Sequence, residues 1–233
     1  MTMFANHLLH TYMTTRLAGS DGVVLDLGAS TADFSAHIVG LYDLDCLAFE
    51  AHPGKLERMA SHPRISLFNR LVSGTDDEQR NVAEQDNGFV WVSELETELG
   101  GETARSVNVA SINLAGILAL VGDRPVALAK VDIEGSEFAF FEAATDAEIL
   151  RVEQFTVEFH DFLDPALSPA VDSVRQRLEG LGYQWMKFTR HTNGDVLAVR
   201  ADCLPAGWRL RYLFEKYRSG ISRILQRMAG KTA

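Results

Sequence analysis

The sequence predicts an α/β protein with a mostly parallel sheet of seven strands, and three observations support this fold class. Short apolar runs recur along the chain, and several end in acidic or other polar side chains. Between them lie segments whose apolar residues recur every three or four positions, as in helices. Near its end the chain has two strand-like runs around Asn193-Gly194-Asp195, a turn sequence that predicts a hairpin. Alternating strands and helices indicate parallel pairing, and the terminal hairpin adds one antiparallel strand.

Each predicted strand is a short apolar run, and each predicted helix has an apolar stripe. Strands are predicted at residues 23–26, 46–50, 65–69, 107–112, 126–131, 155–159, 183–188 and 196–200. Helices are predicted at residues 1–17, after Thr31, and at 54–61, 113–121, 138–144 and 170–181. We expect Ser30 or Thr31 to cap the helix that follows them.

The chain divides into a domain at residues 1–201 and a basic amphipathic helix at residues 202–233. Within the domain, residues 73–112 are assigned to a variable insertion, because residues 73–101 are mostly polar and irregular. Two interpretations of its apolar segment Phe89–Val92 remain, namely a hairpin strand and part of a lid over the substrate. The helix predicted at 206–228 carries apolar residues three and four apart, among many Lys and Arg residues.

Charge separates the tail from the rest of the chain. The net charge is −10 and the isoelectric point about 5.1, which disfavours nucleic acid as a partner of the domain. From Arg200 onward the net charge is +6, so the remainder carries −16. Three interpretations of the basic helix remain: packing on the domain with a solvated basic face, peripheral contact with an anionic membrane, and self-association.

Two features bear on localisation. Cys46 and Cys203 form no paired-cysteine motif, and no run of 18 apolar residues is present. We therefore expect a cytoplasmic protein, peripheral to the inner membrane face if the basic helix binds lipid.

The first predicted strand runs into a loop, Asp26-Leu27-Gly28-Ala29-Ser30, that is typical of nucleotide-binding α/β units. A dinucleotide fingerprint requires a second glycine at the position of Ser30, where the backbone approaches a pyrophosphate. In this chain the side chains of Ser30 and Asp33 would lie against the pyrophosphate. S-adenosylmethionine (SAM) has no phosphate, and its amino group suits an acid such as Asp26. The loop therefore favours SAM over NAD.

A second acid supports a nucleoside ligand. Glu50 ends the second strand about 20 residues beyond the glycine loop, where a carboxylate binds ribose hydroxyls. An α/β unit without a ligand is the remaining alternative. The residues predicted to bind the cofactor are Asp26, Gly28, Ala29, Ser30, Thr31, Phe34, Glu50, Ala51 and Asp132.

Motifs stand at the ends of four predicted strands: Asp26-Leu27-Gly28-Ala29, Ser35, Phe49–Pro53, Lys130–Glu137 and Val157–His160. Over residues 23–200 they resemble the motifs of FkbM-type SAM-dependent methyltransferases. The string Lys-x-Asp-x-Glu-Gly-x-Glu at Lys130 is the most specific. The first loop departs from the family, with Ser30 for a common Asn and Ala32 for a common Gly. The resemblance implies a class I, Rossmann-like methyltransferase fold and methylation of a hydroxyl group, most often on a sugar, a glycoconjugate or a secondary metabolite.

Methyl transfer from a sulfonium to a hydroxyl needs in-line alignment and removal of a proton. His160 is the first choice for the general base, because an ordinary histidine titrates near pH 6.5. Its alternative is a structural histidine at a strand end or bonded to Glu158. Asp132 is predicted beside the methionine end of SAM or the acceptor, and otherwise as a cap for the following turn. Lys130 belongs to the catalytic set or neutralises buried acids.

A divalent metal is an alternative way to activate the acceptor. Asp132, Glu158 and His160 would together offer oxygen and nitrogen ligands for Mg²⁺ or Mn²⁺. The expected partner is a small-molecule or glycan acceptor. Two other function classes remain at this point: an NAD-dependent oxidoreductase, and a methyltransferase-like binding subunit without catalysis.

Overall fold

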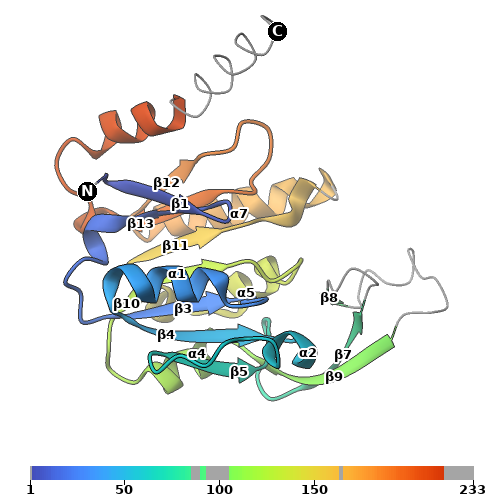
Figure 1. Cartoon of the computed structure of the whole chain (residues 1–233). Coiled ribbons are helices and arrows are strands. Elements are labelled where there is room, and N and C mark those ends of the chain that lie inside the picture. Colours follow the sequence, from blue (N-terminus) through green and yellow to red (C-terminus); the bar gives the residue numbers. More distant parts are fainter. Residues whose placement is uncertain (1, 85–89, 93–104, 163–164, 218–233) are drawn as a thin grey trace, which may run out of the picture.

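The computed structural model describes residues 2–84, 90–92, 105–162 and 165–217 of the chain. Figure 1 shows one large twisted sheet with helices on both sides and a smaller sheet that projects from one end. No helix among these residues is long and apolar enough to cross a membrane.

The large sheet has seven strands, as predicted, and only β13 runs antiparallel to its neighbours. In spatial order the strands are β12 (Tyr183–Lys187), β13 (Val196–Arg200), β11 (Gln154–Val157), β10 (Val126–Val131), β3 (Val23–Leu27), β4 (Asp45–Glu50) and β5 (Ile65–Asn69). The chain order reverses between β3 and β10, so the crevice at their carboxyl ends is the expected ligand position.

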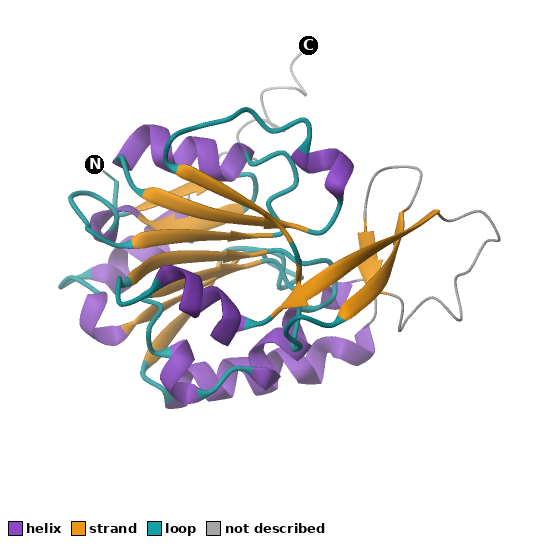
Figure 2. Ribbon diagram, turned by 90° about the horizontal axis from the view of Figure 1, so that it is seen from below, coloured by secondary structure: helices purple, strands orange, loops and turns teal. Residues whose placement is uncertain are grey.

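Helices cover both faces of this sheet (Figure 2). They are α1 (Asp33–Tyr42), α2 (Pro53–Leu56), α4 (Leu114–Val121), α5 (Glu137–Ala143), α6 (Asp146–Ile149) and α7 (Ser168–Gly180). Alternate residues of β3 point to opposite faces: Val23 and Leu25 join the core under α4, α5 and α7, and Val24 joins the core under α1. The strand is therefore apolar on both faces, as a central parallel strand must be.

Neither predicted cap starts α1. The helix begins after Ala32, which has a left-handed conformation with φ of 59° and makes no side-chain capping bond. The Thr31 hydroxyl donates to the Asp33 carboxylate instead, at 2.6 Å. The loop before α1 is held by the backbone bonds of Gly28 and Ala29 to the Phe49 carbonyl and by the bond of the Ser30 N–H to Glu50, and Ser30 is exposed.

The insertion at residues 73–112 contains most of a second sheet. Its strands, in spatial order, are β6 (Leu71–Val72), β9 (Arg105–Ile112), β7 (Gln79–Glu84) and β8 (Val90–Val92). The sequence predicted β9, and β8 lies in the segment for which a hairpin strand was one interpretation. The sequence analysis missed β7, a polar segment that becomes a strand because it pairs with β9 over six residues. Phe89 lies outside the described residues.

The predicted helix at residues 1–17 is wrong. Residues Phe4–His7 (β1) and His10–Met13 (β2) form an antiparallel hairpin, followed by a single 3-10 turn. Leu8 and Leu9, which fitted the helical period, sit in the turn with positive φ angles and exposed side chains. Tyr12 and Met13 are buried through sheet packing rather than through a helical stripe.

Asp195 anchors this hairpin to the large sheet. Its carboxylate accepts hydrogen bonds from the Thr11 backbone N–H at 3.0 Å, the Thr11 hydroxyl at 2.7 Å and the Asn6 amide at 3.1 Å. Asp195 was predicted to lie in the turn of the final hairpin. It lies in the connection between β12 and β13, whose innermost pair is Lys187 with Val196.

We expect Asp195 to make stability pH-dependent. Burial raises the pKa of Asp195 to about 6, against the lowering effect of its bonds from Thr11. The folded state then holds a proton that the unfolded chain releases, so stability falls as pH rises. The free energy of unfolding of the wild type, minus that of Asp195→Asn at the same pH, should fall by on the order of 1–3 kcal/mol between about pH 4 and pH 7. Urea unfolding across this range measures it, and a pH-independent difference would contradict it.

At the other terminus, residues 208–217 form a helix. They fall within the amphipathic helix predicted at 206–228, whose remainder from residue 218 lies outside the described residues.

Candidate active site

A pocket lies at the carboxyl ends of β3, β4 and β10, and Glu50 is fixed beside it. One oxygen of the Glu50 carboxylate accepts the backbone N–H of Ser30 at 2.8 Å, and the other accepts that of His52 at 2.8 Å. Each carboxylate oxygen accepts more than one hydrogen bond. Glu50 is therefore oriented by the backbone and retains acceptor capacity for hydroxyl groups in the pocket.

Gly28 brings two strand ends together below this pocket. Its φ is +79°, and a Cβ at this position would lie 1.7 Å from the carbonyl oxygen of Asp132. Only glycine allows this close approach of the β3 loop to the β10 loop. The left-handed conformations of Ser30 and Glu134 also lie at the pocket, which concentrates backbone strain there.

The structure divides the predicted cofactor residues into two groups. Five line the pocket: Gly28, Ser30, Glu50, Ala51 and Asp132. The other four, Asp26, Ala29, Thr31 and Phe34, do not line it. Phe34 is buried and packs edge-on against the rings of His10 and Tyr12. Lys55, Leu71 and Val72 line the pocket and were missed, although Leu71 and Val72 follow β5 after a single residue.

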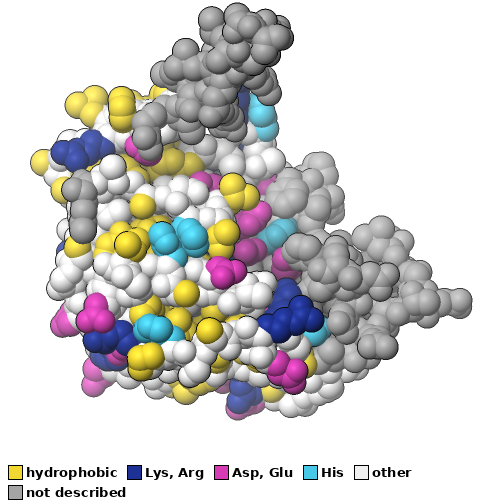
Figure 3. Space-filling view, viewed as in Figure 1, with side chains coloured by type: hydrophobic (Ala, Val, Ile, Leu, Met, Phe, Trp, Pro, Cys, Tyr) yellow, Lys and Arg dark blue, Asp and Glu magenta, His cyan; other side chains and the backbone are white. Residues whose placement is uncertain are grey.

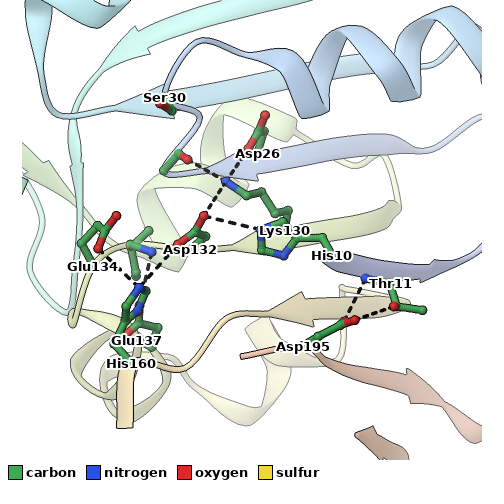
Figure 4. A network of polar contacts seen from close by, with 12 residues as sticks. His10, Thr11, Asp26, Ser30, Lys130, Asp132, Glu134, Glu137, His160 and Asp195 are labelled. Carbon is green, nitrogen blue, oxygen red and sulfur yellow. Dashed lines mark hydrogen bonds and ion pairs between the residues drawn. The ribbon is translucent and has the colours of Figure 1, made fainter. Parts of the chain in front are cut away.

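The Lys130 ammonium links the carboxyl ends of β3 and β10 through ion pairs (Figure 4). Its ammonium lies 3.3 Å from Asp26 and 3.4 Å from Asp132, and it donates to the Gly28 carbonyl at 2.6 Å. Burial disfavours the charged ammonium, but the two carboxylates outweigh this and raise the pKa of Lys130. Lys130 is therefore a buried cation between the two loops, and a raised pKa opposes a role as a base.

Asp26 is part of this buried group. Its carboxylate is fully buried and accepts the Ser35 hydroxyl at 2.6 Å as well as pairing with Lys130. The predicted contact with the amino group of SAM is therefore not available through the pocket. Asp132 is partly exposed at the pocket, and Lys130 lowers its pKa against the effect of burial, so it stays ionised.

His160 does not have the properties of the predicted general base. Its Nδ1 lies 2.8 Å from the buried Glu137 carboxylate, and its Nε2 lies 3.3 Å from Glu134. Burial opposes the charged ring, but these carboxylates prevail and raise the pKa of His160 to about 9. A ring that is protonated at neutral pH donates hydrogen bonds and cannot accept a proton. Glu137, expected at a helix start, also accepts the backbone N–H groups of Ile133 and Gly135.

Two carboxylates near the pocket titrate close to neutral pH. Burial raises the pKa values of Glu134 and Glu158 to about 7, and the charge of Asp132 adds to this. Figure 3 shows acidic side chains and histidines gathered on this side of the molecule. A site with several carboxylates attracts a cation and offers acceptors to hydroxyl groups.

The residues that lie close enough together to bind a metal ion differ from the predicted set. Among the described residues, donor atoms within 4.8 Å of one another form two groups: His10 with Asp132 and Glu158, and Asp132 with Glu134 and His160. Both contain Asp132, and neither is the predicted set of Asp132, Glu158 and His160. Nitrogen and carboxylate donors suit Mn²⁺ or Mg²⁺ in kind. A divalent ion stays a prediction, and His10, Asp132 and Glu158 are its alternative ligands.

His10 is a site residue that the sequence did not reveal. The hairpin brings its Nε2 to 3.4 Å from Asp132, and its ring is almost fully buried against Phe34. Burial lowers the pKa of His10, against the raising effect of Asp132. The misassigned N-terminal helix concealed this contact, because a helix would not have placed His10 on the sheet.

We expect His10→Phe to lower turnover about tenfold, because a hydrogen bond to a charged group contributes about 1.5 kcal/mol or more. Phenylalanine preserves the ring packing on Phe34 and removes the contact with Asp132. Steady-state kinetics and SAM titration measure the effect, which should fall on kcat rather than on SAM affinity. The exposed His191→Phe is the control. Unchanged turnover in His10→Phe would show that His10 has only a packing role.

The sheet order, the single antiparallel strand and the pocket at the switch point define a class I SAM-dependent methyltransferase fold. The chain belongs to the FkbM methyltransferase family, because the model of the methyltransferase FkbM domain matches residues 26–185. This assignment favours SAM over NAD as the cofactor. The search of curated proteins gave no match.

Several solved methyltransferase structures are similar at low identity. A precorrin-6y C5,15-methyltransferase from Geobacter metallireducens is 14% identical with a TM-score of 0.40, covering 81% of this chain and 87% of that chain. A putative caffeoyl-CoA O-methyltransferase from Staphylococcus aureus is 11% identical with a TM-score of 0.43, covering 77% of this chain and 76% of that chain. Human methyltransferase-like protein 13 in complex with SAH is 12% identical with a TM-score of 0.43, covering 84% and 79%. At these identities the likeness concerns the fold alone.

Proposed function

We propose that the protein transfers the methyl group of SAM to a hydroxyl oxygen, with a sugar or glycoconjugate as the acceptor class. The observation that carries the proposal is the Glu50 carboxylate, held beside the pocket by two backbone N–H groups. A carboxylate fixed in this way suits a pair of ribose hydroxyls. The FkbM domain supports methyl transfer, and the acceptor class follows from the family resemblance of the motifs.

Each residue of the site has a role in this proposal. Glu50 binds the ribose, and Gly28 allows the β3 and β10 loops that line the pocket to meet. Asp132 stays ionised and faces the pocket, where it balances the positive charge of a sulfonium ligand. Bound SAM supplies an electrophilic methyl group for in-line displacement. Glu134, which lines the same pocket, accepts hydrogen bonds from acceptor hydroxyls and aligns one of them.

Binding and transfer are tested separately. Calorimetry with SAM, its demethylated product and NAD should give heat for the first two and none for NAD. Transfer of a labelled methyl group is then measured over panels of sugars, glycoconjugates, phenols and amines. SAM binding without transfer to any panel would favour a non-catalytic binding subunit, and transfer to amines alone would overturn O-methylation.

A second experiment uses a chelator to test whether methyl transfer needs a metal ion. Loss of transfer in EDTA, with recovery on Mn²⁺ or Mg²⁺, would support a cation at Asp132. Equal transfer with and without EDTA would leave proton removal to the protein side chains alone. SAM binding is measured in both arms, because the Glu50 contact does not involve the cation.

A further inference from the structure

The C-terminal helix is fixed to the domain by one of its faces. Trp208 and Tyr212 pack against the cluster that contains Met186 and Leu197. The Tyr212 hydroxyl donates to the Lys187 carbonyl at 3.0 Å and accepts the Lys187 N–H at 3.1 Å, and its ring meets Phe188 edge-on. The orientation of residues 208–217 about the helix axis is therefore determined.

The opposite face is apolar and exposed. We call Leu210, Leu213, Phe214 and Tyr217 the outer face; they are 75%, 45%, 69% and 60% exposed. Their spacing of three, four and seven residues places them in one stripe. Four large apolar side chains in one stripe on a surface helix are unusual, because a helix on a globular domain normally turns its apolar stripe inward.

Basic side chains flank this stripe. Arg209 and Arg211 are exposed, and a helical period of 3.6 residues places them on opposite sides of the outer face. In the sequence the same period continues beyond the described residues, with Ile221, Ile224, Leu225 and Met228 in phase with Leu210. An apolar stripe bordered by arginines is the pattern of a helix that lies in a membrane interface.

The charge distribution of the chain indicates which kind of surface the C-terminal helix contacts. Residues from Arg200 onward carry +6, and the remainder carries −16. An anionic bilayer attracts the tail and repels the domain, so the charge asymmetry orients the protein with the outer face toward lipid. A second copy docked tail to tail would bring two groups of like charge together.

We propose that the outer face of the C-terminal helix docks on an anionic lipid bilayer and holds the domain at the membrane surface. Apolar side chains enter the interface, and Arg209 and Arg211 contact the lipid head groups. The docking does not depend on the identity of the methyl acceptor.

The test uses the full chain and sedimentation with vesicles. We expect binding to vesicles of phosphatidylcholine mixed with phosphatidylglycerol, weak binding to phosphatidylcholine alone, and weakening by salt. Leu210→Glu combined with Phe214→Glu should reduce binding at least tenfold. Leu41→Glu is the matched control, since Leu41 is an exposed leucine (57%) on α1, and it should bind like the wild type.

Substitution is preferable to truncation, because removing the tail would also remove the Trp208 and Tyr212 packing. Equal melting temperatures and equal SAM affinity in all variants show that folding and the active site are intact. Failure of the wild type to bind anionic vesicles, or equal binding by the double variant, would overturn the proposal. So would a dimer that the double variant separates, without vesicle binding, because a second copy would then cover the outer face.

Discussion

Replacing Glu50 by alanine should weaken SAM binding by about 100-fold or more, with little change in stability. Two ribose hydroxyls lose hydrogen bonds to a carboxylate, each contributing about 1.5–3 kcal/mol, and about 1.4 kcal/mol corresponds to tenfold in affinity. Ser30 and His52 also lose an acceptor for their backbone N–H groups, but Ser30 lies at the pocket and His52 is only half-buried, so water replaces it. Calorimetry with SAM and with its demethylated product measures the change.

Two variants control this experiment. Glu57→Ala removes an exposed acid from the segment after α2 and should leave binding unchanged. Glu50→Gln keeps the shape, but its amide group would face one of the two N–H donors, so it should also bind weakly. If Glu50→Ala binds SAM as tightly as the wild type, the ribose assignment is wrong, and with it the observation that carries the proposed function.

Replacing Lys130 by methionine should destabilise the protein by about 3–5 kcal/mol, because it leaves buried carboxylates without their cation. Asp26 is fully buried and Asp132 is partly exposed at the pocket, and both pair with the Lys130 ammonium. The Gly28 carbonyl also loses its donor. Urea unfolding at neutral pH measures the loss, with Lys187→Met on β12 as a control that should cost much less.

A double-mutant cycle separates the charge effect from packing. Asp26→Asn removes one of the two negative charges, so combined with Lys130→Met it should cost less than the sum of the single variants. Additive losses would show that Lys130 contributes through packing alone. They would also contradict its assignment as the cation that joins the β3 and β10 loops.

The sequence predicted most of the large sheet because its signals are local. The runs Val23–Leu27 and Val126–Val131 are mostly apolar and too short for helices, and each has an acid at or directly after its end, Asp26 and Asp132. The position of Glu50, one strand beyond the glycine loop, needs no knowledge of distant contacts. The N-terminal hairpin was missed for the opposite reason. It is stabilised by Asp195 and Gln154, which lie far along the chain.

The sequence by itself determined the succession of strands and helices, the glycine loop, and the acid that ends the second predicted strand, because these depend on neighbours in the chain. Only the tertiary structure decided which acids are exposed, which are paired with a cation, and that the neighbouring carboxylates raise the pKa of His160. Those properties arise from burial and from charges that meet across β2, β3, β10 and β11. Proton affinity depends on every charge within a few ångströms, and the linear order of residues does not specify those distances.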